Sequence, residues 1–267
     1  MNLCELFFGA SAVQAPVVYP PAPSNPASGT ASGEAVAGLD SPEPTPPSRK
    51  DDALPLPVNP LSGGETQSVH GSYIGRSYMT PAVVNLLAII RSHEGGWAGY
   101  DADFRNDDRW KLSDYTFDEV RSLGRLQVTA GGRVGGKEPS SAIGGYQFIT
   151  KTLDGLKRDL NARINAAQKT VGFDYIGPRK FTNDLQDDLA YHLMVGRGLL
   201  AFRDGDLSLE SFCNNLAKEW ASLPVVTAIQ GAHRKVLAGQ SYYAGDGLNR
   251  ASHKPEVILD AVWALKR

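Results

Sequence analysis

The chain has 267 residues, of which 42% are apolar and 21% are charged, and its net charge is −2. This length and composition allow one or two domains with a real hydrophobic core. Residues 79–267 carry 24 basic and 22 acidic side chains, and this near-neutral balance excludes a strongly basic nucleic-acid surface. Two cysteines exclude a disulfide framework, and no apolar run approaches the ~18 residues of a membrane span.

The N-terminal part of the chain predicts an extended arm. Twelve of the 17 prolines lie within residues 1–70, and such segments favour extended over packed structure. The first 15 residues make a poor signal peptide, because they lack a basic region and carry Glu5 among apolar residues. We therefore expect an apolar anchor over residues 1–15, a Pro/Ser/Gly-rich linker over 16–78 and a folded domain over 79–267. A disordered leader or an atypical export signal is the alternative to the anchor.

Apolar residues at helical spacing predict at least five helices. The first begins at Thr80-Pro81, a cap followed by a first-turn proline, and ends at Gly95-Gly96. Between the first and second helices, residues 110–136 combine turn signals with β-prone pieces and predict a small antiparallel sheet. The expected fold class is α+β, mainly α, with a small β-lobe after the first helix. The other apolar stripes run over Leu153 to Ile164, Leu185 to Leu200, Leu209 to Leu223 and Ile258 to Leu265.

One carboxylate continues the apolar stripe of the first helix. Val83, Leu87 and Ile90 step by four and three, and the next step of four reaches Glu94. Burial and the negative end of the helix dipole both disfavour the charged carboxylate, so they raise its pKa. A carboxyl that stays protonated near neutral pH can act as a general acid. The alternative is that Glu94 lies in a frayed last turn and faces water.

Two other motifs do not carry the chemistry that they resemble. His93-Glu94 opens like a zinc-protease helix, but Trp97 stands where the second histidine ligand belongs. The glycine-rich run from Gly131 to Lys137 is followed by Glu138 instead of the Ser or Thr of a phosphate-binding loop. We expect a flexible hairpin over a cleft there, and neither a metal nor a nucleotide site.

Three segments of the chain are distinctive in composition and order: Ser92-His93-Glu94-Gly95, Ala142 to Phe148 and Phe212 to Pro224. They resemble three blocks of the phage lambda endolysin family, the lambda-type lytic transglycosylases, and follow in the same order. The similarity extends roughly over residues 82–267. It implies a lysozyme-like fold, in which two lobes flank a cleft for peptidoglycan glycan strands, and an activity that needs no metal or organic cofactor.

The resemblance also implies roles for single residues. Glu94 matches the essential carboxylate, which acts as general acid and then as base. Tyr146 and Gln147 would line the cleft, although Tyr146 could instead pack inside the fold, and Trp220 is expected in the core. The further substrate-binding candidates are Ser141, Ser222, Tyr242 and Asp101.

Two alternatives to a transglycosylase stay open. Asp101 and Asp103 lie close to where related hydrolytic lysozymes keep a second acid, so a muramidase that uses Glu94 with either of them is the first. The second is a non-catalytic, wall-binding structural protein of the virion. For delivery, we expect a virion protein that acts in the host periplasm, with residues 1–15 bound to another virion protein. An endolysin held in the host cytoplasm until lysis is the alternative.

Overall fold

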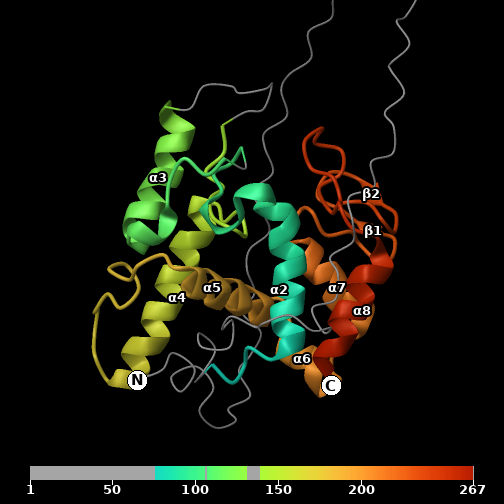
Figure 1. The fold of residues 1–267 in the computed structure, drawn as a ribbon. Helices are drawn as coiled ribbons and strands as arrows, with labels where there is room; N and C mark the ends of the chain where they lie inside the picture. Colours follow the sequence, from blue (N-terminus) through green and yellow to red (C-terminus); the bar gives the residue numbers. More distant parts are fainter. Residues whose placement is uncertain (1–75, 106, 131–138, 267) are drawn as a thin grey trace, which may run out of the picture. The chain divides into compact units, whose positions relative to one another are not determined.

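The computed structural model describes residues 76–105, 107–130 and 139–266, and this part is mainly helical, as predicted (Figure 1). The expected anchor, nearly all of the expected linker and the predicted hairpin over 131–138 lie outside the described residues. Within them, no helix is long and apolar enough to cross a membrane. The elements are α2 (Pro81–Glu94), η1 (Gly96–Asp101), η2 (Leu112–Asp114), α3 (Phe117–Ala130), α4 (Thr150–Gln168), α5 (Asn183–Gly196), α6 (Leu199–Asp204), α7 (Leu209–Ala217), β1 (Ile229–Gln230), β2 (Lys235–Val236), α8 (Pro255–Trp263) and η3 (Ala264–Lys266).

Helix α2 has the predicted ends. The side chain of Thr80 accepts a hydrogen bond from the amide of Val83 at 3.4 Å, and Pro81 occupies the first turn. Gly95 caps the other end, where its amide donates to the carbonyl of Arg91 at 2.9 Å. The helix therefore places Glu94 in its last turn, on the side that continues the buried stripe.

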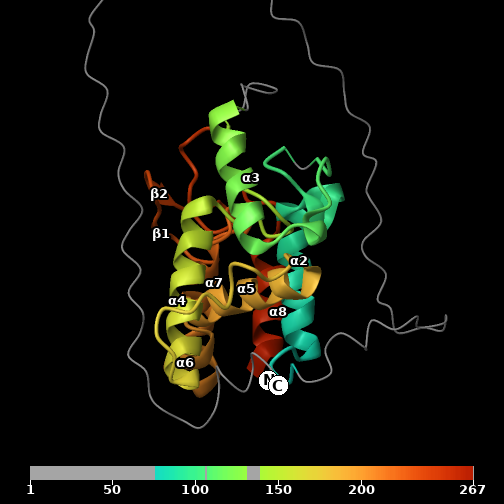
Figure 2. The same ribbon diagram turned by 90° about the vertical axis from the view of Figure 1, so that its left-hand side faces the viewer.

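Helix α5 forms the centre of the helical assembly. Eight of its 14 residues are buried, which is far more than one face of a surface helix provides. Figures 1 and 2 both show α5 crossing the middle, with α2 and α8 side by side next to it. Helix α2 contacts both α5 and α8, so the candidate carboxylate is attached to the best-packed part of the fold.

Two of the predicted helices end earlier than their apolar stripes. The stripe from Leu185 to Leu200 divides into α5 and α6, because Gly198 adopts a φ of 106°, in the left-handed region that a helix cannot include. Helix α7 stops at Ala217, and Trp220 lies in the turn beyond it. The indole of Trp220 is only 2% exposed, which confirms the expected core position.

The predicted sheet over residues 110–136 is wrong in its place. Residues Phe117–Ala130 form α3, and the described part of the chain has its small antiparallel sheet at β1 and β2 instead. The cause is a capping box: Thr116 accepts from the amide of Glu119 at 3.3 Å, and Glu119 accepts from the amide of Thr116 at 2.6 Å. These reciprocal bonds start a helix at residues whose composition suggested a strand.

The described chain makes contacts with the central helix from Arg76 onward, ahead of the predicted boundary at residue 79. The guanidinium of Arg76 forms an ion pair with Asp188 of α5, and its Nη2 donates to the carbonyl of Asp184 at 3.0 Å. The hydroxyl of Tyr78 also donates to Asp188, at 2.5 Å. These contacts join the start of the described chain to the central helix.

Candidate active site

Glu94 receives a hydrogen bond from a segment that is remote in the sequence. Its side chain is partly buried, and the backbone amide of Ser222 donates to its Oε1 at 3.0 Å. The first and third blocks that the sequence analysis singled out therefore meet at this carboxylate. A donor aimed at the carboxylate oxygen holds the side chain in one place, in contrast to a glutamate that faces water from a frayed turn.

Burial dominates the electrostatics of Glu94. It raises the pKa of the carboxyl above its ordinary value of 4.5, while the hydroxyl and the amide of Ser222 act in the opposite direction and offset only part of the rise. This upward shift of the Glu94 pKa agrees with the prediction from the apolar stripe of the first helix. A carboxyl in this environment keeps its proton at a higher pH than a carboxyl in water, and it still has a donor ready when the proton leaves.

The turn that carries Ser222 is fixed from several sides. The amide of Trp220 donates to the carbonyl of Leu216 at 3.0 Å, and Ser241 Oγ donates to the carbonyl of Ala221 at 2.8 Å. On the far side, the carbonyl of Ser222 accepts from the amide of Ser252 at 2.8 Å. The amide that faces Glu94 is therefore part of a preorganised turn.

Tyr243 is a neighbour of Glu94 that the sequence analysis missed. Burial raises the pKa of its phenol, and the nearby carboxylates of Glu219 and Glu94 raise it further. Its hydroxyl donates to the carbonyl of Lys218 at 2.6 Å. The sequence analysis chose the adjacent Tyr242, whose ring is partly buried and lies 5.1 Å from the ring of Tyr243. The glycine-tyrosine stretch pointed to this pair of tyrosines, and the substrate-binding role of Tyr242 stays a prediction.

The second block forms a tight turn against the end of α2. A Cβ on Gly95 would lie 2.5 Å from the carbonyl oxygen of Gly99 and 3.1 Å from the Cα of Gly145. Gln147 in the same turn has a φ of 49°, and its Nε2 donates to the carbonyls of Asp103 and Gly144. This block is thus adjacent to Glu94, as the resemblance implies, although the amide donor of Gln147 is engaged by backbone.

Tyr146 does not line a cleft as the resemblance implied. Its side chain is 1% exposed, so its ring has no face on which a sugar could stack, and the packing alternative describes it. The hydroxyl donates to Asp187 of α5 at 2.6 Å, and Arg91 of α2 donates to the same hydroxyl at 3.3 Å. Tyr100 of η1 donates to Asp187 as well, at 2.8 Å. Tyr146 is therefore part of a buried polar network that ties together α2, η1, the second block and α5.

Three other predicted residues already have hydrogen-bond or ion-pair partners within the fold. Ser141 Oγ accepts from the amide of Thr150 at the start of α4, at 3.0 Å. Asp101 accepts from the amide of Leu112 at 2.8 Å. Asp103 is fully buried and bonded to the side chains of Arg105 and Arg109, so it presents no surface to water or sugar. This environment removes Asp103 as a second catalytic acid.

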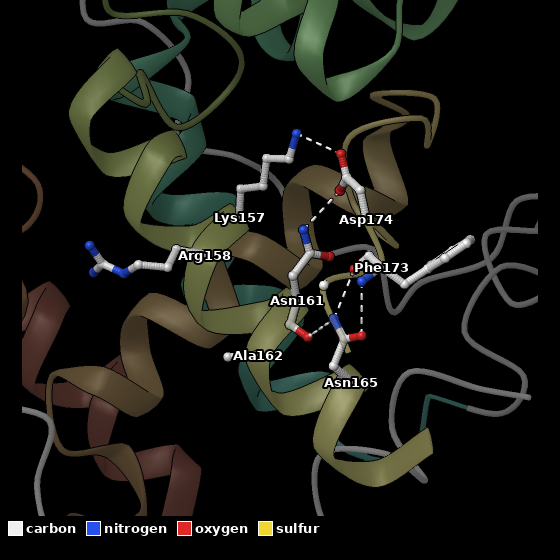
Figure 3. Close-up of a pocket in the computed structure, with 8 residues that line it drawn as sticks. Lys157, Arg158, Asn161, Ala162, Asn165, Phe173 and Asp174 are labelled. Atoms are coloured by element: carbon white, nitrogen blue, oxygen red, sulfur yellow. Dashed lines mark hydrogen bonds and ion pairs between the residues drawn. The ribbon is translucent and has the colours of Figure 1, made fainter. Parts of the chain in front are cut away.

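One surface hollow in the described residues lies elsewhere, on α4 and the segment that follows it. Its polar side chains bond to one another: Lys157 pairs with Asp174 at 2.7 Å, and Asn161 Nδ2 donates to Asp174 at 2.8 Å (Figure 3). None of the predicted site residues lines it. Nor does the described part of the chain contain a group of three or more His, Cys, Asp or Glu side chains placed to hold a metal ion.

Compared with family models, curated proteins and solved structures, the chain gives no significant match.

Proposed function

We propose that the protein is a lytic transglycosylase with a lysozyme-like fold, which cleaves the bond between N-acetylmuramic acid and N-acetylglucosamine in peptidoglycan. One observation carries the proposal: Glu94, the carboxylate of the first block, is partly buried with a raised pKa and accepts a hydrogen bond from Ser222 of the third. The three blocks that resemble lambda-type enzymes lie around this one carboxyl group.

The mechanism requires only Glu94. Its carboxyl donates a proton to the glycosidic oxygen, and the bond from that oxygen to C1 of the muramoyl residue breaks. The carboxylate then takes the proton of the C6 hydroxyl of the same muramoyl residue, and the C6 oxygen attacks C1. This step forms a 1,6-anhydro ring and restores the protonated Glu94 without consuming water. The amide of Ser222 stabilises the carboxylate between the two proton transfers.

The other acidic groups favour transglycosylation over hydrolysis. Hydrolysis with either stereochemical outcome uses a second carboxylate, as a nucleophile or as a base for water. Asp103 is buried in two ion pairs, and Asp101 caps the backbone at Leu112. Glu219, which lies near Tyr243, receives two hydrogen bonds from Arg197, at 2.9 and 2.6 Å. Each of these three carboxylates thus has a structural partner, whereas Glu94 accepts its hydrogen bond from the backbone amide of Ser222.

We further propose that the protein belongs to a phage particle and acts on the wall in the host periplasm, with the Pro-rich arm as a tether. A long extended linker enlarges the volume that a tethered enzyme can reach. The glycan strand would be the substrate, and another virion protein would be the partner of residues 1–15.

The Glu94→Gln variant tests the proposed activity. Glutamine keeps the size and the acceptor for Ser222 but cannot donate the proton, so lysis of purified sacculi should fall at least about 100-fold. Glu210→Gln, an exposed carboxylate at the start of α7, is the matched control and should lyse as fast as the wild type. Undiminished lysis by Glu94→Gln, with its melting temperature retained, would contradict the role of Glu94.

A further inference from the structure

A large apolar side chain is exposed close to Glu94 in the chain. Trp97 is 75% exposed, whereas Trp263 is 48% exposed, Trp110 is partly buried and Trp220 is buried. Only Gly95 and Gly96 separate Trp97 from Glu94 in the chain, so the Cα atoms of Glu94 and Trp97 lie within about 11 Å. Single exposed apolar side chains are common on protein surfaces, so exposure alone assigns Trp97 no role. What distinguishes Trp97 is its place in the chain next to Glu94 and the fixed backbone that carries it.

The backbone that carries Trp97 is fixed on both sides. The amide of Gly99 donates to the carbonyl of Gly95 at 3.1 Å, and Gly95 itself has no room for a side chain. Gly96 and Gly99 have φ values of 55° and 56°, which only glycine adopts readily.

On the C-terminal side of Trp97, Tyr100 anchors the same turn. Its hydroxyl accepts from Arg91 at 2.7 Å and donates to Asp187 at 2.8 Å, in the buried network of α2 and α5. The turn is therefore rigid. It begins one residue after Glu94, and the indole of Trp97 extends from it into solvent.

We infer that Trp97 is a sugar-binding platform, on which one hexosamine ring of the glycan strand stacks next to the bond that Glu94 protonates. This inference rests on the proposed function. Pyranose rings of β-1,4-linked glycans carry their C–H bonds on the two faces, and these faces are apolar. An indole supplies a large flat apolar surface with little conformational freedom to lose, and a rigid backbone reduces that loss further. Trp97 thereby positions the strand and does not take part in proton transfer.

The test uses the full chain and purified sacculi. Trp97→Ala should raise the KM for sacculi about tenfold, the effect of one aromatic contact, and leave kcat within about threefold. Trp97→Phe, which keeps a flat ring, should restore part of the affinity. Trp263→Ala is the matched control, because Trp263 is 48% exposed at the end of α8. Melting temperatures should be unchanged, since Trp97 makes little contact with the core.

A binding measurement separates this inference from the proposed activity. In the Glu94→Gln background, a hexamer of N-acetylglucosamine and purified sacculi are both titrated, and Trp97→Ala should weaken binding while Trp263→Ala should not. An unchanged KM together with unchanged binding in Trp97→Ala would overturn the platform and leave the proposed activity intact. Wild-type protein that neither cleaves nor binds sacculi would overturn both. Loss of self-association in Trp97→Ala, with KM unchanged, would assign Trp97 to a protein interface instead.

Discussion

Glu94 joins a partly buried carboxyl to a backbone donor that is already in place for its anion. Burial raises the pKa, which favours the proton that a general acid must carry, and the Ser222 amide limits the cost of losing it. Glu94 must first donate a proton and then, as a base, accept one from the C6 hydroxyl. A very high pKa would keep Glu94 protonated, so it could not lose its proton in the first step, and the Ser222 amide limits this effect.

The raised pKa predicts the direction of the pH dependence of cleavage. The protonated form of Glu94 starts the reaction, so the rate should fall as pH rises through a pKa that lies above the ordinary 4.5. The measurement is kcat/KM on sacculi as a function of pH, which reports the free enzyme. A descending limb at or below 4.5 would contradict the environment that we describe for Glu94.

The same pKa shift predicts a pH-dependent gain of stability in Glu94→Gln. The folded state holds the Glu94 proton more tightly than the unfolded state, so wild-type stability falls as pH rises from about 4.5 through the folded pKa. Glutamine has no such loss. The variant should match the wild type in stability below pH 4.5 and be more stable than the wild type at neutral pH. Denaturant unfolding at several pH values measures this, and a difference that does not change with pH would contradict it.

Residue positions were predictable where a local pattern decides them. The stripe of α2 leads to Glu94, and the third block contains Ser222. Tyr146 was not predictable, because its burial depends on Asp187, which is 41 residues away in the sequence. No local pattern encodes a hydrogen bond between a turn and a distant helix.

At the scale of elements, the contact between the end of α2 and the second block decides where Glu94 lies. Gly95 has no room for a side chain, since a Cβ there would lie 3.1 Å from both the Cα and the carbonyl oxygen of Gly145 and 2.5 Å from the carbonyl oxygen of Gly99. Such backbone contacts are rigid, because no side chain can rotate to relieve them.

Gly95→Ala should therefore disturb both stability and activity. Its Cβ would meet three backbone atoms of Gly99 and Gly145, and we expect a loss of about 1–3 kcal/mol and slower lysis, because Glu94 is the preceding residue. The matched control is Gly155→Ala in α4, where nothing lies within 4 Å and alanine should add about 0.5–1 kcal/mol. Chemical denaturation and lysis assays measure both. A Gly95→Ala protein that equals the wild type would show that this contact does not hold Glu94.

How well each helix could be predicted depended on how local its sequence signals are and on whether those signals agree. The caps at Thr80 and Gly95 predicted α2 to the residue. The capping box of Thr116 and Glu119 is equally local. Because strand-prone residues surround it, the sequence pattern predicted a sheet where α3 forms. Helix α3 shows that two side-chain to backbone bonds at a helix start outweigh strand propensity within it.

At the scale of the whole molecule, the described chain includes a short lead-in that is joined to the central helix. Asp188 of α5 is only 12% exposed and has Arg76 and Tyr78 as partners. The sequence analysis assigned Arg76 and Tyr78 to the linker. A basic and an aromatic residue at the end of a long Pro-rich stretch do not indicate, by themselves, an ion pair with a residue more than 100 positions away.

This attachment predicts a sharp boundary for truncation. A fragment of residues 76–267 should keep the stability of the folded part and its lysis of sacculi. A fragment of residues 79–267 leaves Asp188 buried without its cation, and removal of one partner of a buried pair costs about 3 kcal/mol or more. Thermal unfolding compares the two, and Arg76→Ala in the full chain should reproduce most of the loss. Equal melting temperatures would contradict this role of Arg76.

The central claim is that Glu94 alone carries out both proton transfers, and the chemistry of the new chain ends tests it most directly. Purified sacculi are digested with the wild-type protein, and the muramoyl ends are identified by mass spectrometry. We predict 1,6-anhydromuramoyl ends, absent from the digest made with Glu94→Gln. Reducing muramoyl ends, heavier by one water, would contradict the account and show that a second group activates water.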